Sequence, residues 1–110
     1  MKVDQKGHTT IIKDTQNNVE VFLGKLMNEY HVFQSQNLIL DVSHNTTLAN
    51  ADLVHFKEFA KTHAKAKKSM IIVTDVVDFD KVPTYLNVVP SVLEAHDMIE
   101  MDEIERDLGF

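Results

Sequence analysis

The chain has 110 residues, a formal net charge of −6 and no cysteine, which favours one compact domain spanning residues 1–110. The absence of cysteine excludes disulfides, thiolate zinc sites and cysteine nucleophiles. The acidic balance argues against nucleic acid as a partner, because surfaces that bind it are normally basic. No signal-peptide core follows MKVDQKG, and no apolar run approaches the ~20 residues of a membrane span. We therefore expect a cytoplasmic protein with no membrane insertion.

The first third of the chain predicts a β-hairpin followed by a long helix. Short strands at 3–5 and 9–13 flank a turn at Gly7-His8. Asn17 followed by Glu20 fits a capping box, with Asn in place of Ser or Thr. Apolar residues then recur every three or four positions, which predicts one amphipathic helix containing Val19, Phe22, Leu23, Leu26, Met27, Tyr30 and Phe33.

The middle of the chain predicts two buried strands with a second helix between them. Residues 38–42 are predicted to form a buried strand, and residues 70–73 are apolar without polar alternation, as in a strand that is covered on both faces. Asn50 is the expected N-cap of the helix. The apolar positions of this segment are Leu48, Leu53, Phe56, Phe59, Ala60 and His63.

The last third predicts a short strand and a C-terminal helix. Residues 76–86 are ambiguous and allow a short helix that ends near Pro83, before a strand at 87–89. Ser91 and Glu94 form a capping box that opens a helix, with a break near Met101 left open and Gly109 at its end. The order of elements predicts an α/β fold, with a mixed sheet of four to five strands covered by helices. An N-terminal hairpin would be followed by parallel strands.

Three segments together resemble the STAS domain, the sulfate transporter and anti-sigma factor antagonist family. They are NLILDVS at 37–43, MIIV at 70–73 and VVPSVLEA at 88–95, and their order and spacing carry the resemblance. It implies a STAS-like fold and a bacterial regulatory module that binds protein and is not an enzyme. In the antagonists, the loop after the middle strand reads roughly D-S-S-G. A kinase-like anti-sigma factor phosphorylates one of its serines, which releases the partner.

This loop departs from the family pattern. Aligned on Asp41, residues 49–52 read ANAD, so the phosphorylated serine is absent and the serine phosphoswitch cannot be carried over. What the resemblance still implies is a docking surface for a protein partner on the loop and the helix after it. The expected partner-binding residues are Ser43, His44, Thr46, Thr47, Leu48, Asn50, Asp52, Leu53 and Phe56.

Several of these residues have two interpretations. Asp52 either stabilises the dipole of the helix that it opens, or permanently replaces the charge of the family's phosphoserine. Ser43, Thr46 and Thr47 are either turn residues or sites of modification. His44 could titrate near neutral pH or lie solvated at the surface.

Two other classes of function stay open beside protein binding. One is a carrier or sensor of a small apolar molecule, with a pocket between sheet and helices. The other is a small magnesium-dependent enzyme using Asp41 and Asp75, since Asp75, Asp78 and Asp80 follow the strand at 70–73; the alternative is that these three are solvated turn residues. No catalytic residue, metal ligand or cofactor is expected otherwise. The six histidines include no pair at i, i+4, and the HxHxDH run of metallo-β-lactamase-type hydrolases such as ribonuclease Z is absent.

Charge is unevenly distributed along the chain. A basic stripe consists of Lys57, Lys61, Lys65 and Lys68, and an acidic segment of Asp97, Glu100, Asp102, Glu103, Glu105 and Asp107. These are either two solvated faces, or faces that attract each other within one chain or in a homodimer, or a dock for a charged partner. The apolar residues of the last segment either seal the sheet edge or form a partner surface; they are Met98, Met101, Ile104, Leu108 and Phe110.

Overall fold

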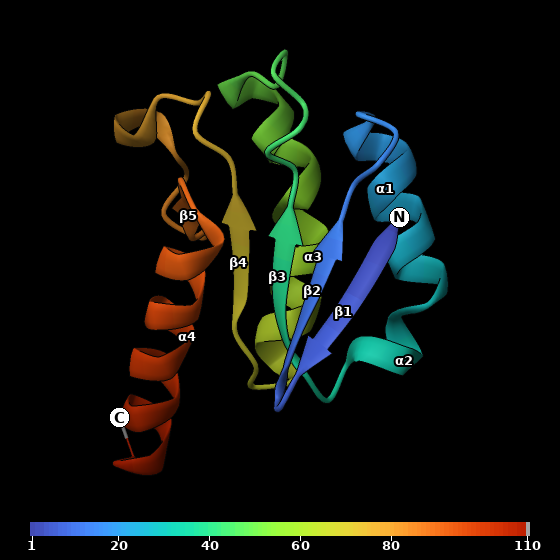
Figure 1. Cartoon of the computed structure of the whole chain (residues 1–110). Coiled ribbons are helices and arrows are strands. Elements are labelled where there is room, and N and C mark those ends of the chain that lie inside the picture. The colour runs from blue at the N-terminus through green and yellow to red at the C-terminus, as the bar shows by residue number, and fades with distance from the viewer. Residues whose placement is uncertain (110) are drawn as a thin grey trace.

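The computed structural model describes residues 1–109 and shows an α/β fold with one five-stranded mixed sheet (Figure 1). The strands lie in the order β1-β2-β3-β4-β5. Strand β1 (Lys2–Lys6) pairs antiparallel with β2 (Thr9–Lys13), and β3 (Asn37–Asp41), β4 (Met70–Val73) and β5 (Val88–Val89) follow in parallel. The predicted α/β fold, with a hairpin followed by parallel strands, is confirmed. Phe110 lies outside the described residues, and so does the prediction made for it.

Helical segments cover both faces of the sheet. One face carries α1 (Val19–Asn28), α2 (Tyr30–Phe33), the 3-10 segment η1 (Asn50–Phe56) and α3 (Lys57–Lys65), and the other carries α4 (Val92–Asp107) (Figure 1). A short 3-10 turn, η2 (Phe79–Lys81), precedes β5. Among residues 1–109, no helix has both the length and the apolar character that a membrane crossing requires.

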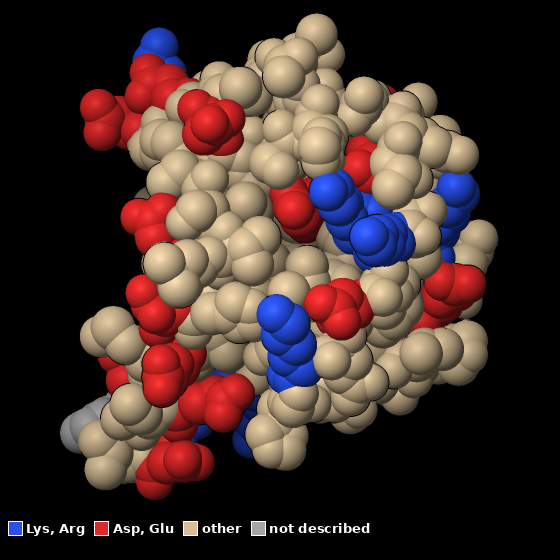
Figure 2. Space-filling model, in the orientation of Figure 1, with Lys and Arg blue, Asp and Glu red and all other residues tan. Residues whose placement is uncertain are grey.

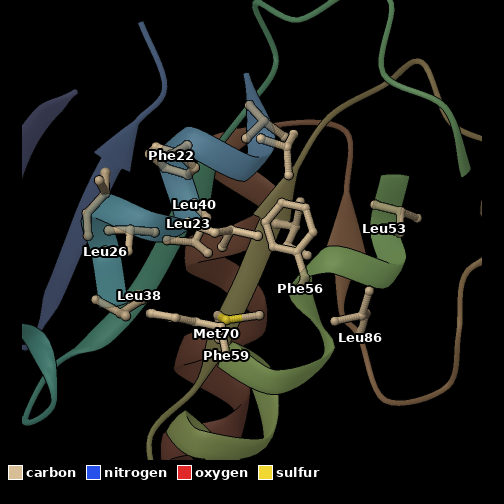
Figure 3. Packing of buried hydrophobic residues seen from close by; sticks show 14 of the residues in the cluster. Phe22, Leu23, Leu26, Leu38, Leu40, Leu53, Phe56, Phe59, Met70 and Leu86 are labelled. Atoms are coloured by element: carbon tan, nitrogen blue, oxygen red, sulfur yellow. The ribbon is translucent and has the colours of Figure 1, made fainter. Parts of the chain in front are cut away.

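Alternation along the strands divides the core in two. Leu38 and Leu40 of β3 point into the larger core, which contains residues of α1, η1 and α3 (Figure 3). Ile39 points the other way and packs with Ala95 and Ile99 of α4. All four residues of β4 are buried, as expected of a strand covered on both faces.

The prediction of one long helix over residues 19–33 is wrong. The chain leaves helical geometry at Glu29, with φ −108° and ψ 12°, so that α1 and α2 are separate helices. The break turns the chain between Leu26 and Phe33, and both of these side chains remain buried. Tyr30, which follows the break, reaches the ring of His63 in α3.

Both predicted caps in this half of the chain are displaced by one residue. Asn18, not Asn17, caps α1, and its side chain accepts a hydrogen bond from the Val21 amide at 3.1 Å. Asn17 has a positive φ of 53°, a conformation that Asn tolerates better than most residues. The N-cap of η1 is Ala49, not Asn50, and the first turn after the loop is a 3-10 helix.

The C-terminal helix follows its predicted caps. The hydroxyl of Ser91 accepts a hydrogen bond from the Glu94 amide at 3.2 Å and donates to the Glu94 carboxylate at 2.9 Å. Helix α4 runs without a break through Met101. Gly109 lies just past the helix with φ 81°, in the left-handed region that glycine occupies at helix ends.

Candidate functional site

Two loops meet at the carboxyl end of the parallel strands, where α/β proteins commonly place their binding sites. The loop after β2 covers residues 14–18, and the loop after β3 covers residues 42–49 (Figure 1). A hollow of about 180 Å³ lies between them, lined by Asn17, Asn18, Val19, Glu20, Asn45, Thr47, Leu48, Asp52 and His55. A hollow of about 310 Å³ is lined by Lys13, Asp14, Thr15, Asn17 and His44, so the two share Asn17. Most of these side chains are polar, which does not favour an apolar ligand.

Buried carboxylates shape the start of each loop. Asp14 is 3% exposed, and its two oxygens accept hydrogen bonds from the amides of Gln16 and Asn18 at 3.0 and 3.1 Å. Asp41 accepts from the amide and the hydroxyl of Ser43 at 3.0 and 2.6 Å. Each carboxylate therefore accepts a backbone hydrogen bond in place of a carbonyl and stabilises the turn, as Asp does in Asx turns.

Asn45 joins the two loops. It is 8% exposed, and its amide donates to the Asn17 carbonyl at 3.4 Å. Its side-chain oxygen accepts from the amide and the hydroxyl of Thr47 at 3.2 and 2.9 Å. Asn45 and Asp14 are structural residues of the site that the sequence analysis missed. Each is followed two positions later by a polar residue, and this spacing was visible in the sequence. The contact of Asn45 with Asn17, 28 positions away, was not.

The predicted partner-binding residues divide into three groups. Leu48, Leu53 and Phe56 are 4%, 0% and 0% exposed, so they belong to the core and offer no area to a partner. They anchor residues 48–56 in the core. His44, Thr46 and Thr47 are exposed, and Ser43 is half-buried against Asp41.

The third group, Asn50 and Asp52, has a local structural role. Asp52 accepts a hydrogen bond from the Ala49 amide at 2.8 Å, which satisfies a donor at the start of η1. Asn50 bonds both the amide and the carbonyl of Asp78 at 2.8 Å and so fastens η1 to the loop before η2. Both side chains are half-buried.

Carboxylates and histidines near this end of the sheet remain scattered. Asp75, Asp78 and Asp80 are exposed, and Asp78 accepts from the Asp80 amide at 3.0 Å, as a cap of η2. His55 lies 3.4 Å from Glu20 across the smaller hollow. Within residues 1–109, no three His, Asp or Glu side chains form a group that could hold a metal ion.

The amino end of the sheet has a polar network that is closed on itself. Asn37 is 1% exposed, and its side-chain oxygen accepts from the Ser69 amide at 3.0 Å and from Arg106 at 3.2 Å. Its amide nitrogen donates to Glu103. The Ser69 hydroxyl donates to Asp102 at 2.8 Å and accepts from Arg106 at 3.0 Å. This network ties α4 to β3 and to the start of β4.

A buried histidine lies beside this network. His63 is 0% exposed, with one ring nitrogen 2.9 Å from the Gln36 carbonyl and the other 2.8 Å from the Tyr30 hydroxyl. Since a carbonyl can only accept, Nε2 carries the proton and Nδ1 accepts from Tyr30. Burial lowers the pKa of His63, and the positive charge of Lys68 lowers it further. Burial also raises the pKa of Tyr30.

The chain matches no family model, no curated protein and no solved structure. What the geometry defines is an α/β protein whose carboxyl-end loops are pinned by buried side chains and present polar groups outward. Its amino end, in contrast, has its polar groups bonded to one another.

Proposed function

We propose that this protein is a non-enzymatic, cytoplasmic regulatory module that binds another protein through the loop after β3. The support is the combination of a fixed backbone and exposed tips within one segment. Asp41 and Asn45 hold the turns of this loop, and Leu48 anchors its end in the core. A loop held in this way loses little conformational entropy on binding.

The strand that leads into this loop belongs to NLILDVS at 37–43, one of the three segments on which the resemblance to the STAS domain rests. The proposed binding surface consists of the accessible residues Ser43, His44, Thr46 and Thr47, with Asp52 at its border. It has no serine at 49–52 to phosphorylate. Asp52 places a carboxylate at the start of η1, where it accepts from the Ala49 amide.

The test is capture of partners from extracts of the source cell with a loop variant and a matched control. His44→Arg with Thr46→Arg changes two exposed side chains and leaves the bond between Thr47 and Asn45 in place, whereas a substitution at Leu48 would disturb the core. Gln34→Arg with Ser35→Arg adds the same two side chains at exposed positions before β3, near the amino end of the sheet. We expect a discrete protein to bind the wild type and the control but not the loop variant. If the wild type retains nothing that the loop variant loses, the proposal fails.

A further inference from the structure

Helix α4 has an apolar stripe that its own sheet does not cover. Ala95 and Ile99 face the sheet and are 0% and 3% exposed. On the other side, at 100° per residue, four large apolar side chains lie within an arc of about 80°. They are Leu93, Met101, Ile104 and Leu108, which are 55% to 72% exposed.

Acidic side chains lie within this stripe and on both sides of it. Five exposed carboxylates accompany it, namely Glu94, Asp97, Glu100, Glu105 and Asp107, and Figure 2 shows acidic side chains gathered along the edge where α4 lies. The one basic side chain of α4, Arg106, is directed toward Ser69 and Asn37 and does not neutralise them. The outer face of α4 is therefore both apolar and negative.

Helix α3 has the opposite character on the opposite face of the molecule. Lys57, Lys61 and Lys65 are exposed and lie within about 80° of one another around the helix. A groove of about 160 Å³ beside α3 is lined in part by Ala60, Ala64 and Met70. The rest of the lining is polar and consists of Lys68, Ser69, Tyr85, Asn87, Asp102 and Arg106, so the groove carries both signs of charge around a small apolar floor.

Helices α3 and α4 pack on opposite faces of the sheet (Figure 1), and of α4 only Asp102 and Arg106 line the groove beside α3, so the outer stripe of α4 does not face the lysines of α3 in the same molecule. Among residues 1–109, His55 and Glu20 are the one pair of basic and acidic side chains that lie within 4.0 Å of each other. Packing α4 against α4 of another copy would bring carboxylates together, which is unfavourable. The complementary surface that the chain itself offers to α4 is α3.

We propose that α4 of one molecule docks on α3, and on the groove beside it, of a second copy of this chain. The carboxylates of α4 meet the lysines of α3, while Ile104 and Leu108 cover the apolar parts of the groove and the methylene stems of the lysines. The contact is heterologous, since it joins two different surfaces. It uses neither the loop after β3 nor the partner proposed for that loop.

The test is analytical ultracentrifugation of two charge-reversal variants at about 10 mM ionic strength, where the screening length is about 30 Å. One variant carries Lys57→Glu, Lys61→Glu and Lys65→Glu, and the other carries Asp97→Lys, Glu100→Lys and Glu105→Lys. We expect the wild type to self-associate and each variant alone to sediment as a monomer. An equimolar mixture should associate again, because each reversed face then meets a complementary face.

Two controls separate this contact from a general charge effect. Lys2→Glu, Lys6→Glu and Lys13→Glu change net charge as much as the α3 variant does, but lie on β1 and β2, and should associate like the wild type. Ile104→Ser should weaken association by about tenfold or more without altering charge, whereas Val32→Ser, equally exposed on α2, should not. A monomeric wild type overturns the proposal. So does a mixture that stays monomeric, or a β1–β2 variant that loses association with the α3 variant.

Discussion

The two ends of the sheet use buried polar side chains in opposite ways. At the amino end, Asn37 and Ser69 bond to side chains of α4, so the network closes on itself. At the carboxyl end, Asp14, Asp41 and Asn45 bond mainly to the backbone and to hydroxyls of their own loops. The first arrangement joins elements of the fold, whereas the second fixes the path of loops whose tips stay in water. A rigid, exposed loop is what binding requires, and only the carboxyl end provides one.

The largest expected effect comes from the core beneath the carboxyl-end loop. Phe56→Ala should lower the free energy of unfolding by about 3–5 kcal/mol, because a fully buried ring is replaced by a cavity. Thr46→Ala, ten residues earlier and exposed, should change it by less than about 0.5 kcal/mol. Urea titration of both variants measures the difference. Equal losses would mean that the loop tip is not separate from the core.

A substitution in the amino-end network should lower the free energy of unfolding more than one among the polar residues of the carboxyl end. Asn37→Ala leaves the buried Ser69 amide without an acceptor and removes one of the two hydrogen bonds of Arg106, at a cost of about 2–3 kcal/mol. Asn50→Ala removes two hydrogen bonds to Asp78 that lie near solvent, at a cost of about 1 kcal/mol or less. Thermal unfolding of the two variants compares them, and a larger loss at Asn50 would reverse our ranking of the two ends.

Acid should destabilise the protein through His63. Burial holds the folded-state pKa of His63 below the usual value of 6.5, so the unfolded chain takes up a proton first as the pH falls. The stability that neutral His63 contributes is complete above about pH 6.5 and is lost below it, toward the folded-state pKa. Thermal unfolding between pH 5 and pH 8 should therefore show a weaker dependence in His63→Gln than in the wild type. His44→Gln, at an exposed position, should retain the full dependence.

The smallest effect is expected at the start of η1. Asp52→Ala removes the acceptor of the Ala49 amide and a carboxylate at a helix start, and should cost about 0.5–1 kcal/mol. Asp97→Ala, on the exposed face of α4, is the matched control with a smaller expected loss. No difference between the two melting temperatures would remove the capping role that we assign to Asp52.

Apolar runs were sufficient to predict the buried strands β3 and β4, because those runs reflect burial directly. The exposed strand β1 was predicted from the turn at Gly7-His8, and the C-terminal helix from its capping box, since several of its apolar residues are exposed. Periodicity alone was not sufficient elsewhere. Periodicity did not predict the break at Glu29. The apolar spacing continues past the break, because Phe33 is buried whether residues 19–33 form one helix or two. The same ambiguity affected the candidate site. Leu48, Leu53 and Phe56 have the spacing of an apolar surface, and only the packing shows that this surface faces inward. Long-range pairs such as Asn45 with Asn17 leave no local pattern at all.

The central claim is that the carboxyl-end loop is the partner surface and the amino end is not. Site-specific photo-crosslinking in the source cell tests it directly, with a benzophenone side chain at Thr46 or, for comparison, at Ser35 before β3, both of which are exposed. We predict a discrete protein adduct from position 46 and none from position 35. The absence of an adduct from position 46, or the same adduct from both positions, would contradict the account.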